Sequence, residues 1–195
     1  MSANGSASKM HLSAARTRAR LGRSTAKTRG SAMSQFKTPS VVIGPDEGLS
    51  LWQPLPSRGY VNVALMPSNM PFDTFSAGIQ VMPPGCYVRQ HAHAQNHELI
   101  FIYEGTGTCT IDGVVHDVKP GTTVLFGRHG QHRIDNTGTI DMKLFWVFMP
   151  PGLEDWFQAI GRPRKPGEPM PDAFPRPDNV GAVMEKLRFV PPPAT

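Results

Sequence analysis

Three histidines and one glutamate carry the chemistry that this 195-residue chain suggests. His91 and His93 are two residues apart, Glu98 follows closely, and His132 comes much later in the chain. Because side chains alternate between the two faces of a strand, His91 and His93 project to the same side. Neutral imidazoles and a carboxylate are ligands for divalent transition metals. The four residues therefore predict a metal site that is built from strands.

The separation of these residues also predicts a curved sheet. Residues 94–97 reverse the chain between His93 and Glu98, and Glu98 begins a largely apolar run. His132 belongs to a separate, later strand. Ligands from three strands can converge only where the sheet curls around an interior, so the site predicts a barrel.

The segment from Gly85 to Gly105 reads G-x5-H-x-H-x4-E-x6-G. This pattern resembles the first sequence signature of the cupin superfamily. The second signature, G-x5-P-x-G-x2-H-x3-N, is matched by Gly121, His132 and Asn136. Two positions depart from it: residue 127 is glycine where proline is usual, and residue 129 is histidine where glycine is usual. Both departures fall in a turn, so they concern loop shape rather than metal ligation.

The resemblance implies an all-β fold, the cupin-type double-stranded β-helix or jelly-roll barrel, over residues 50–150. The end of the chain, with a GLEDWF segment, a proline-rich strap and a terminal FVPPP, is similar to single-domain cupins of the quercetin-dioxygenase-like group. The resemblance also implies a homodimer, and it assigns His91, His93, Glu98 and His132 as the metal ligands.

The hydrophobic alternation of the sequence also agrees with this fold, independently of the resemblance to cupins. Short runs that are typical of strands are separated by turn residues, and they span 60–66, 74–82, 86–93, 98–105, 107–111, 114–118, 122–126, 131–136 and 142–149. Asp112 and Gly113 predict a type I′ hairpin turn. Many short strands with no helix between them favour an antiparallel sandwich or barrel.

Residues 151–195 are expected to pack on the barrel as a helix, a proline-rich strap and a terminal helix. Leu153, Trp156, Phe157 and Ile160 are spaced to form one apolar face of a short helix, with Gly161 as its C′ residue. This helix either packs on the outside of the barrel or forms a lid over its mouth. The strap spans 162–178, and a last helix is expected over 179–187.

The basic residues are concentrated at the N-terminus. Residues 1–37 hold eight basic and no acidic side chains, which leaves 12 basic and 15 acidic residues in the remainder. Residues 1–34 have little to bury, so a disordered basic extension is expected. It could bind nucleic acid, act as an organelle transit peptide, or precede a true start at Met33. Nucleic-acid binding depends on this segment alone and is the least supported partner.

The composition also bears on the cellular setting. The chain contains no apolar run near 18 residues, so no membrane span is expected. Two cysteines, Cys86 and Cys109, are too few for a disulfide framework and are expected to be buried thiols in a reducing compartment. A cytoplasmic location follows from these two expectations.

The substrate pocket is expected to be lined by residues in phase with the metal ligands. These residues are Tyr87, Arg89, Ile100, Ile102, Glu104, Ile134 and Asn136. An inward Arg89 could bind a substrate carboxylate or enolate, although it could also extend outward at the strand end. His97 adjoins Glu98 and is expected to face away from the site. Arg89 and Glu98 are the predicted catalytic residues, since Glu98 could act as a base if it leaves the metal.

A metal with four protein ligands keeps one or two open positions, which is typical of a catalytic site. Fe(II) is the expected metal, with Mn(II), Ni(II), Zn(II) and Cu(II) as alternatives. The apolar lining and the scarcity of dedicated bases favour a dioxygenase that acts on an aromatic or enol-type small molecule, through substrate chelation and O₂ activation. One alternative is an isomerase or lyase that uses the metal as a Lewis acid and Tyr87 or Glu104 as a base. A second is a non-catalytic module that binds a small molecule.

Overall fold

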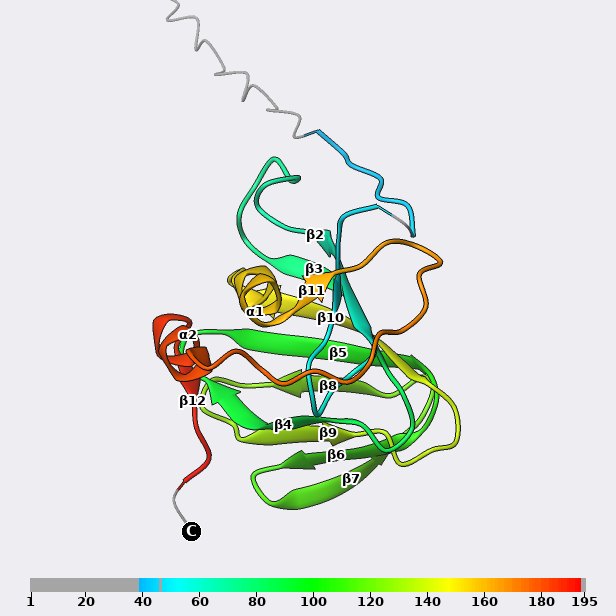
Figure 1. The fold of residues 1–195 in the computed structure, drawn as a ribbon. Coiled ribbons are helices and arrows are strands. Elements are labelled where there is room, and N and C mark those ends of the chain that lie inside the picture. Colours follow the sequence, from blue (N-terminus) through cyan, green and yellow to red (C-terminus); the bar gives the residue numbers. More distant parts are fainter. Residues whose placement is uncertain (1–38, 46, 194–195) are drawn as a thin grey trace, which may run out of the picture. The chain divides into compact units, whose positions relative to one another are not determined.

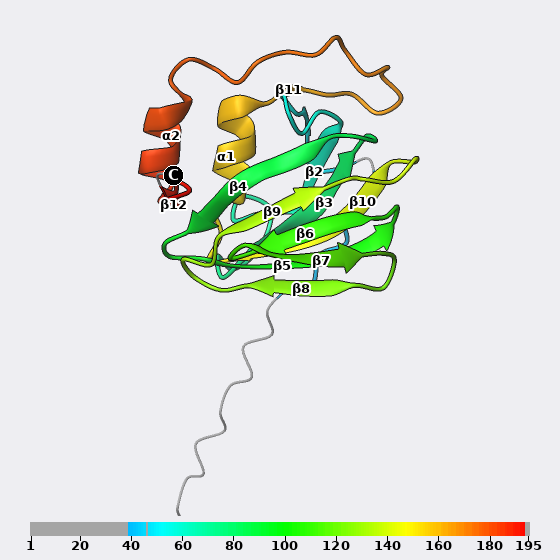
Figure 2. The same ribbon diagram turned by 90° about the horizontal axis from the view of Figure 1, so that it is seen from below.

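The computed structural model describes residues 39–45 and 47–193, which form two antiparallel β-sheets and two short helices (Figure 1). The predicted N-terminal extension, residues 1–34, lies outside the described residues. The larger sheet has seven strands among the described residues, in the order β11-β1-β2-β3-β10-β5-β8. The smaller sheet has five, in the order β12-β4-β9-β6-β7. Figure 2 shows the two sheets as facing layers.

The strands of the larger sheet are β1 (Leu49–Trp52), β2 (Tyr60–Leu65), β3 (Ser76–Met82), β5 (His97–Glu104), β8 (Thr123–Phe126), β10 (Met142–Met149) and β11 (Arg162–Pro163). Those of the smaller sheet are β4 (Tyr87–His93), β6 (Gly107–Ile111), β7 (Val114–Val118), β9 (His132–Asp135) and β12 (Phe189–Val190). The helices are α1 (Leu153–Ile160) and α2 (Val180–Lys186). The predicted all-β class, a double-stranded β-helix with short C-terminal helices, is confirmed.

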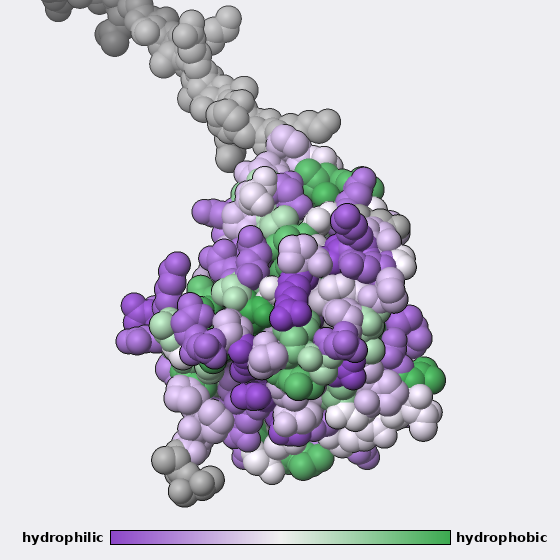
Figure 3. All heavy atoms as spheres, viewed as in Figure 1, coloured by the Kyte–Doolittle hydropathy of each residue, from purple (hydrophilic) through white to green (hydrophobic). Residues whose placement is uncertain are grey.

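The core lies between the two sheets because the long strands alternate between apolar and mixed positions. On β10, Leu144, Trp146 and Phe148 are buried, whereas Phe145 faces outward and is exposed. On β5, Ile100 and Ile102 are fully buried in the same way. Period-two alternation of this kind gives each strand one face for the core and one for the surface. The surface in Figure 3 accordingly mixes hydrophilic and apolar residues.

Three strands escaped sequence-based prediction. β11 and β12 have two residues each and carry no alternation that could be recognised. They form because tertiary pairing places Arg162 opposite Trp52, and Phe189 opposite His93. β1, with four residues, is held between β2 and β11. Short strands at the ends of sheets are therefore set by their partners rather than by local propensity.

Two predicted turns have different outcomes. Asp112 and Gly113 both have positive φ, 47° and 84°, as the type I′ hairpin requires. Gly161 follows the last residue of α1 directly, one position earlier than a C′ residue, and its backbone is extended, with φ −89° and ψ 175°. Glycine is required there for space, because a Cβ atom would lie 2.7 Å from the carbonyl oxygen of Phe157 and 3.0 Å from that of Trp52.

The C-terminal segment lies against the barrel. The apolar face of α1 is buried, and the ring of Phe157 lies 5.6 Å from that of Trp146 in the core. The proline-rich strap is held to the barrel by backbone hydrogen bonds, including one from Leu55 to the carbonyl oxygen of Phe174. The strap then returns the chain to α2, which lies beside α1 (Figures 1 and 2). Within the described part of the chain, no helix has the length and apolar character needed to span a membrane.

Replacing Phe157 by alanine should destabilise the fold by about 3–5 kcal/mol, because a buried aromatic ring is lost and the space cannot refill. Gln158→Ala is the matched control, since Gln158 occupies the next position of α1 and is exposed. Urea unfolding followed by circular dichroism measures both variants. Equal stabilities of the two variants would show that α1 does not pack as described.

Candidate metal centre

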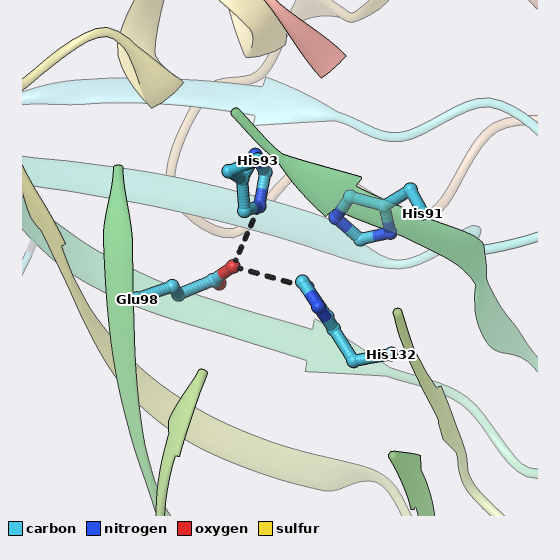
Figure 4. Close-up of side chains that lie close together, drawn as sticks. All are labelled: His91, His93, Glu98 and His132. Carbon is cyan, nitrogen blue, oxygen red and sulfur yellow. Dashed lines mark hydrogen bonds and ion pairs between the residues drawn. The ribbon is translucent and has the colours of Figure 1, made fainter. Parts of the chain in front are cut away.

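The structure brings the four predicted ligands together. One ligand atom from each of His91, His93, Glu98 and His132 can be chosen so that all four lie within 4.8 Å of one another. Figure 4 shows the four side chains pointing toward a common point. His91 and His93 come from β4, Glu98 from β5 and His132 from β9, so the site joins the two sheets.

Strand pairing explains this convergence. His91 lies directly opposite His132 in the β4–β9 ladder. Glu98 stands on β5 between two other strands, opposite Phe148 of β10 and Phe126 of β8. The carboxylate therefore points from the larger sheet toward imidazoles of the smaller sheet. The interior of a small barrel is narrow enough for side chains from both sheets to meet at one site.

Hydrogen bonds orient the imidazoles. Nδ1 of His91 lies 2.7 Å from the carbonyl oxygen of Arg89, and Nδ1 of His132 lies 2.9 Å from that of Gly130. An Nδ1–H that donates to a carbonyl leaves Nε2 with a free lone pair, which is the form that binds a metal. Nε2 of His132 is buried and has no hydrogen-bond partner among the described residues.

The carboxylate of Glu98 lies between two of these rings. Its Oε2 is 3.1 Å from Nε2 of His93 and 3.5 Å from Nε2 of His132 (Figure 4). Glu98 is 9% exposed, whereas His93 and His132 are each 1% exposed. An anionic oxygen surrounded by imidazole nitrogens is a donor set that suits a divalent transition metal.

Aromatic rings fix the remaining faces of the imidazoles. Phe126 stacks on His132 with ring centroids 3.9 Å apart and nearly parallel planes. Phe148 meets His93 edge-on at 4.7 Å, and Phe189 of β12 contacts both His91 and His93. These contacts hold the rings in place.

The protonation states also suit a metal. Burial, together with the neighbouring His132 and His93, lowers the pKa of His91 to about 3. Burial alone would raise the pKa of Glu98, but the imidazoles of His132 and His93 outweigh burial and lower that pKa. At neutral pH His91 is therefore neutral and Glu98 is ionised, which is what metal ligation requires.

The cluster opens onto a cavity of about 310 Å³. His91, Glu98 and His132 form one part of its wall. The other lining residues are Gln53, Ser57, Gln80, Val88, Arg89, Gln90, Ile134, Leu144, Leu153, Trp156, Phe157, Ile160, Arg176, Met184, Phe189 and Pro192. The apolar face of α1 thus closes one side of the cavity, in line with the second interpretation of that helix.

The predicted pocket residues fall into two groups. Arg89 and Ile134 line the cavity. Ile100 and Ile102 point inward as expected, but they are fully buried in the core and do not reach the cavity wall. They are in phase with Glu98 and lie further along β5, where side chains from both sheets fill the interior.

Tyr87 lies outside the cavity, and a β-bulge is the reason. Between Val88 and His91 the β4–β9 register shifts, so Val88 pairs with Ile134 and His91 pairs with His132. An extra residue in β4 reverses the alternation at this point. Val88 therefore faces the cavity, and the ring of Tyr87 instead lies under the guanidinium of Arg133, 3.8 Å away.

Glu104 and Asn136 were also expected to line the pocket, but neither side chain lies at the cavity wall. Glu104 lies at the end of β5, where its carboxylate accepts a 2.8 Å hydrogen bond from Lys143. Asn136 is buried and donates to the carbonyl oxygens of Met82 and Ile140, and its own side-chain oxygen accepts from the backbone of Gly138. Asn136 thus stabilises the turn that follows β9.

Several cavity residues were missed from the sequence. Phe189 and Arg176 lie far from the signatures in the chain, and the strap that carries Arg176 has no periodicity to indicate a facing side. Gln53, just after β1, is 4% exposed and gave no signal beyond its polarity. His97 is exposed on the opposite face of β5, as expected, and His129 is exposed in its turn with φ 62°. That positive φ explains why glycine is usual at this position.

Comparison with known proteins agrees with this geometry. Residues 78–148 match a family model described as "Cupin domain". This stretch therefore resembles a cupin domain. It contains all four ligands of the candidate metal centre. The quercetin-dioxygenase-like subgroup is not distinguished by this match.

Curated relatives align with about a third of the chain. An uncharacterized protein of Methanocaldococcus jannaschii is 31% identical over 71 residues, which are 36% of this chain and 57% of that protein. An L-ectoine synthase of Mycolicibacterium vanbaalenii is 42% identical over 62 residues, which are 30% of this chain and 46% of that enzyme. The chain thus spans about half the length of these relatives.

Among solved structures, a Thermotoga maritima protein described as a predicted oxalate decarboxylase superposes with a TM-score of 0.49 and 23% identity. The superposition covers 56% of this chain and 99% of that protein.

Removing one ligand should weaken metal binding strongly. His132→Ala is expected to lower the affinity for a divalent metal by more than roughly tenfold, because changing groups that merely orient ligands already costs about 10–100-fold. His97→Ala is the matched control, since His97 adjoins Glu98 but faces outward. Titration with Co(II), followed by its visible absorption, measures both. Equal losses in the two variants would contradict the assigned ligand set.

Replacing Asn136 by alanine should lower stability by about 2–3 kcal/mol, because buried backbone groups lose their partners. Metal affinity should stay unchanged, since Asn136 is not among the ligands. Asn136→Asp keeps the oxygen that accepts from Gly138 but loses both donors to the carbonyl oxygens, so it should be destabilised as well. If the alanine variant kept its stability but bound ligands more weakly, Asn136 would line the substrate pocket, as the sequence predicted, rather than stabilise the turn.

Proposed function

We propose that this protein is a metal-dependent cupin enzyme, and specifically a dioxygenase that acts on an aromatic or enol-type small molecule. The observation that carries the proposal is the position of the ligand cluster. Three imidazoles and one carboxylate meet beside a cavity of about 310 Å³, and the carboxylate and two of the imidazoles form part of its wall. A site that stays open on one side can accept a substrate beside the metal.

The shape and lining of the cavity suit a small apolar substrate. Its volume is at the lower end of the usual range for ligand sites, about 300–1,000 Å³. Trp156, Phe157 and Phe189 provide flat apolar surface on the walls. A bound divalent metal, for which Fe(II) is our first choice, would supply Lewis acidity and a place for O₂. The protein itself would orient the substrate ring and exclude bulk water.

The scarcity of bases favours oxygenase chemistry over proton transfer. Apart from the metal ligands, the only titratable side chains that line the cavity within the described residues are Arg89 and Arg176. Arginine stays protonated near neutral pH and cannot act as a general base. Tyr87 and Glu104, the bases that an isomerase or lyase would use, contact Arg133 and Lys143 instead. Glu98 remains the one candidate base.

A non-oxidative isomerase or lyase is the second candidate, and the similarity to proteins named L-ectoine synthase favours it. Such an enzyme would use the metal as a Lewis acid and would need Glu98 to exchange protons while leaving the metal. Three imidazoles would then hold the metal alone. The two candidates differ in whether O₂ is consumed.

Oxygen consumption separates the two candidates. Protein loaded with Fe(II) under nitrogen should consume O₂ when mixed with a panel of catechols, flavonols and enediols, and both atoms of ¹⁸O₂ should appear in the product. Chelation of the metal, or the Glu98→Gln substitution, should reduce the rate by at least about tenfold. An oxygen electrode and mass spectrometry provide the measurements. Substrate conversion without O₂ uptake would favour the isomerase or lyase.

A further inference from the structure

Two arginines from distant parts of the chain line the cavity that holds the metal ligands. Arg89 lies on β4, two residues before His91, and Arg176 lies near the end of the proline-rich strap. The strap thus contributes a charged side chain to a site built otherwise by the barrel and α1. The metal cluster does not need either arginine, because neither contacts Glu98.

Neither guanidinium has an anionic partner among the described residues. The ion pairs formed by described residues join Glu98 to two histidines, Arg133 to Asp135, and Lys143 to Glu104. Nε of Arg176 is buried and has no hydrogen-bond partner among the described residues. A buried donor on a charged group without a partner is costly, so its position calls for an explanation.

The two charges are also close enough to affect each other. Burial and the positive charge of Arg89 together lower the pKa of Arg176 to about 10. Arg176 still carries its charge at neutral pH. Its guanidinium lies 5.2 Å from the ring of Trp156, which holds its plane at the cavity wall. Two like charges placed together without a counter-charge favour the binding of an anion.

The cavity wall also holds a neutral donor. Gln53 lines the cavity, is 4% exposed, and its Nε2 has no hydrogen-bond partner within the described range. By contrast, the hydroxyl of Ser57 already donates to the carbonyl oxygen of Tyr87 at 3.2 Å. The unpaired groups of this wall are therefore donors, whereas the metal cluster presents an anionic carboxylate.

We propose that Arg89, Arg176 and Gln53 bind a carboxylate group of the substrate, so that the protein acts on an organic acid with an apolar body. The inference rests on the proposed function in one respect, that the cavity is a substrate site. About 7 Å of strand separate the Cα atoms of Arg89 and His91, since a strand rises about 3.3 Å per residue. A small aromatic acid can therefore place its carboxylate at the arginines and its ring toward the metal ligands.

Carboxylate recognition can be tested by binding alone. Isothermal titration calorimetry would compare benzoate, phenylacetate and 3-phenylpropionate with their uncharged amides, using full-length, metal-loaded protein. The best acid should bind at least roughly tenfold more tightly than its amide, because hydrogen bonds to charged groups are strong. The preference should persist after chelation, since the arginines rather than the metal hold the carboxylate.

Variants identify the groups responsible. Arg89→Gln and Arg176→Gln should each reduce the preference for the acid by several-fold. Arg162→Gln is the matched control, because the Arg162 guanidinium also stacks on an aromatic ring, Phe174, but does not line the cavity. Thermal midpoints check folding, and Arg89 is exposed, so its variant tests the proposal even if Arg176→Gln is unstable.

Three results would overturn the proposal. The first is that the acids bind no more tightly than their amides, or do not bind at all. The second is that Arg89→Gln leaves the preference for the acid over the amide unchanged. The third is that this preference disappears when the metal is chelated. None of them depends on turnover. A failure to consume O₂ would overturn the dioxygenase and leave carboxylate binding intact, so the two failures can be told apart.

Discussion

A buried carboxylate between imidazoles is the constraint on which the rest of this structure depends. Burying an ionised carboxyl group costs several kcal/mol unless opposite charges or hydrogen bonds offset it. Here Oε2 of Glu98 lies 3.1 Å from His93 and 3.5 Å from His132. A divalent cation at the centre would compensate the charge more fully than neutral rings can. The fold therefore holds Glu98 where its charge is useful for binding a metal.

The barrel achieves this by bringing two sheets within reach of one small site. His91 and His132 face each other across one ladder, and Glu98 approaches from the other sheet. The bulge in β4 sets His91 in phase with His132 and turns Val88, rather than Tyr87, toward the cavity. Helix α1 and the strap then close the open end. The lining of the cavity includes the anionic Glu98 and two cationic arginines.

Sequence patterns predicted the parts of the site that depend on local spacing. The ligands His91, His93, Glu98 and His132 follow from two signatures, and nine strands follow from alternation and turn residues. The rest depends on tertiary contacts. A bulge of one residue displaced Tyr87, and Asn136 proved to be occupied by backbone groups of its own turn. Arg176 belongs to a strap with no periodicity, so only the folded chain shows that it reaches the cavity.

The central claim is that one metal ion is held by these four side chains. Anomalous X-ray diffraction at the absorption edge of the metal that co-purifies with the protein tests it most directly. The account predicts one peak per chain, at roughly 2.0–2.3 Å from Nε2 of His91, His93 and His132 and from a carboxylate oxygen of Glu98. A peak at other residues, such as His129, or no peak at this site, would contradict it.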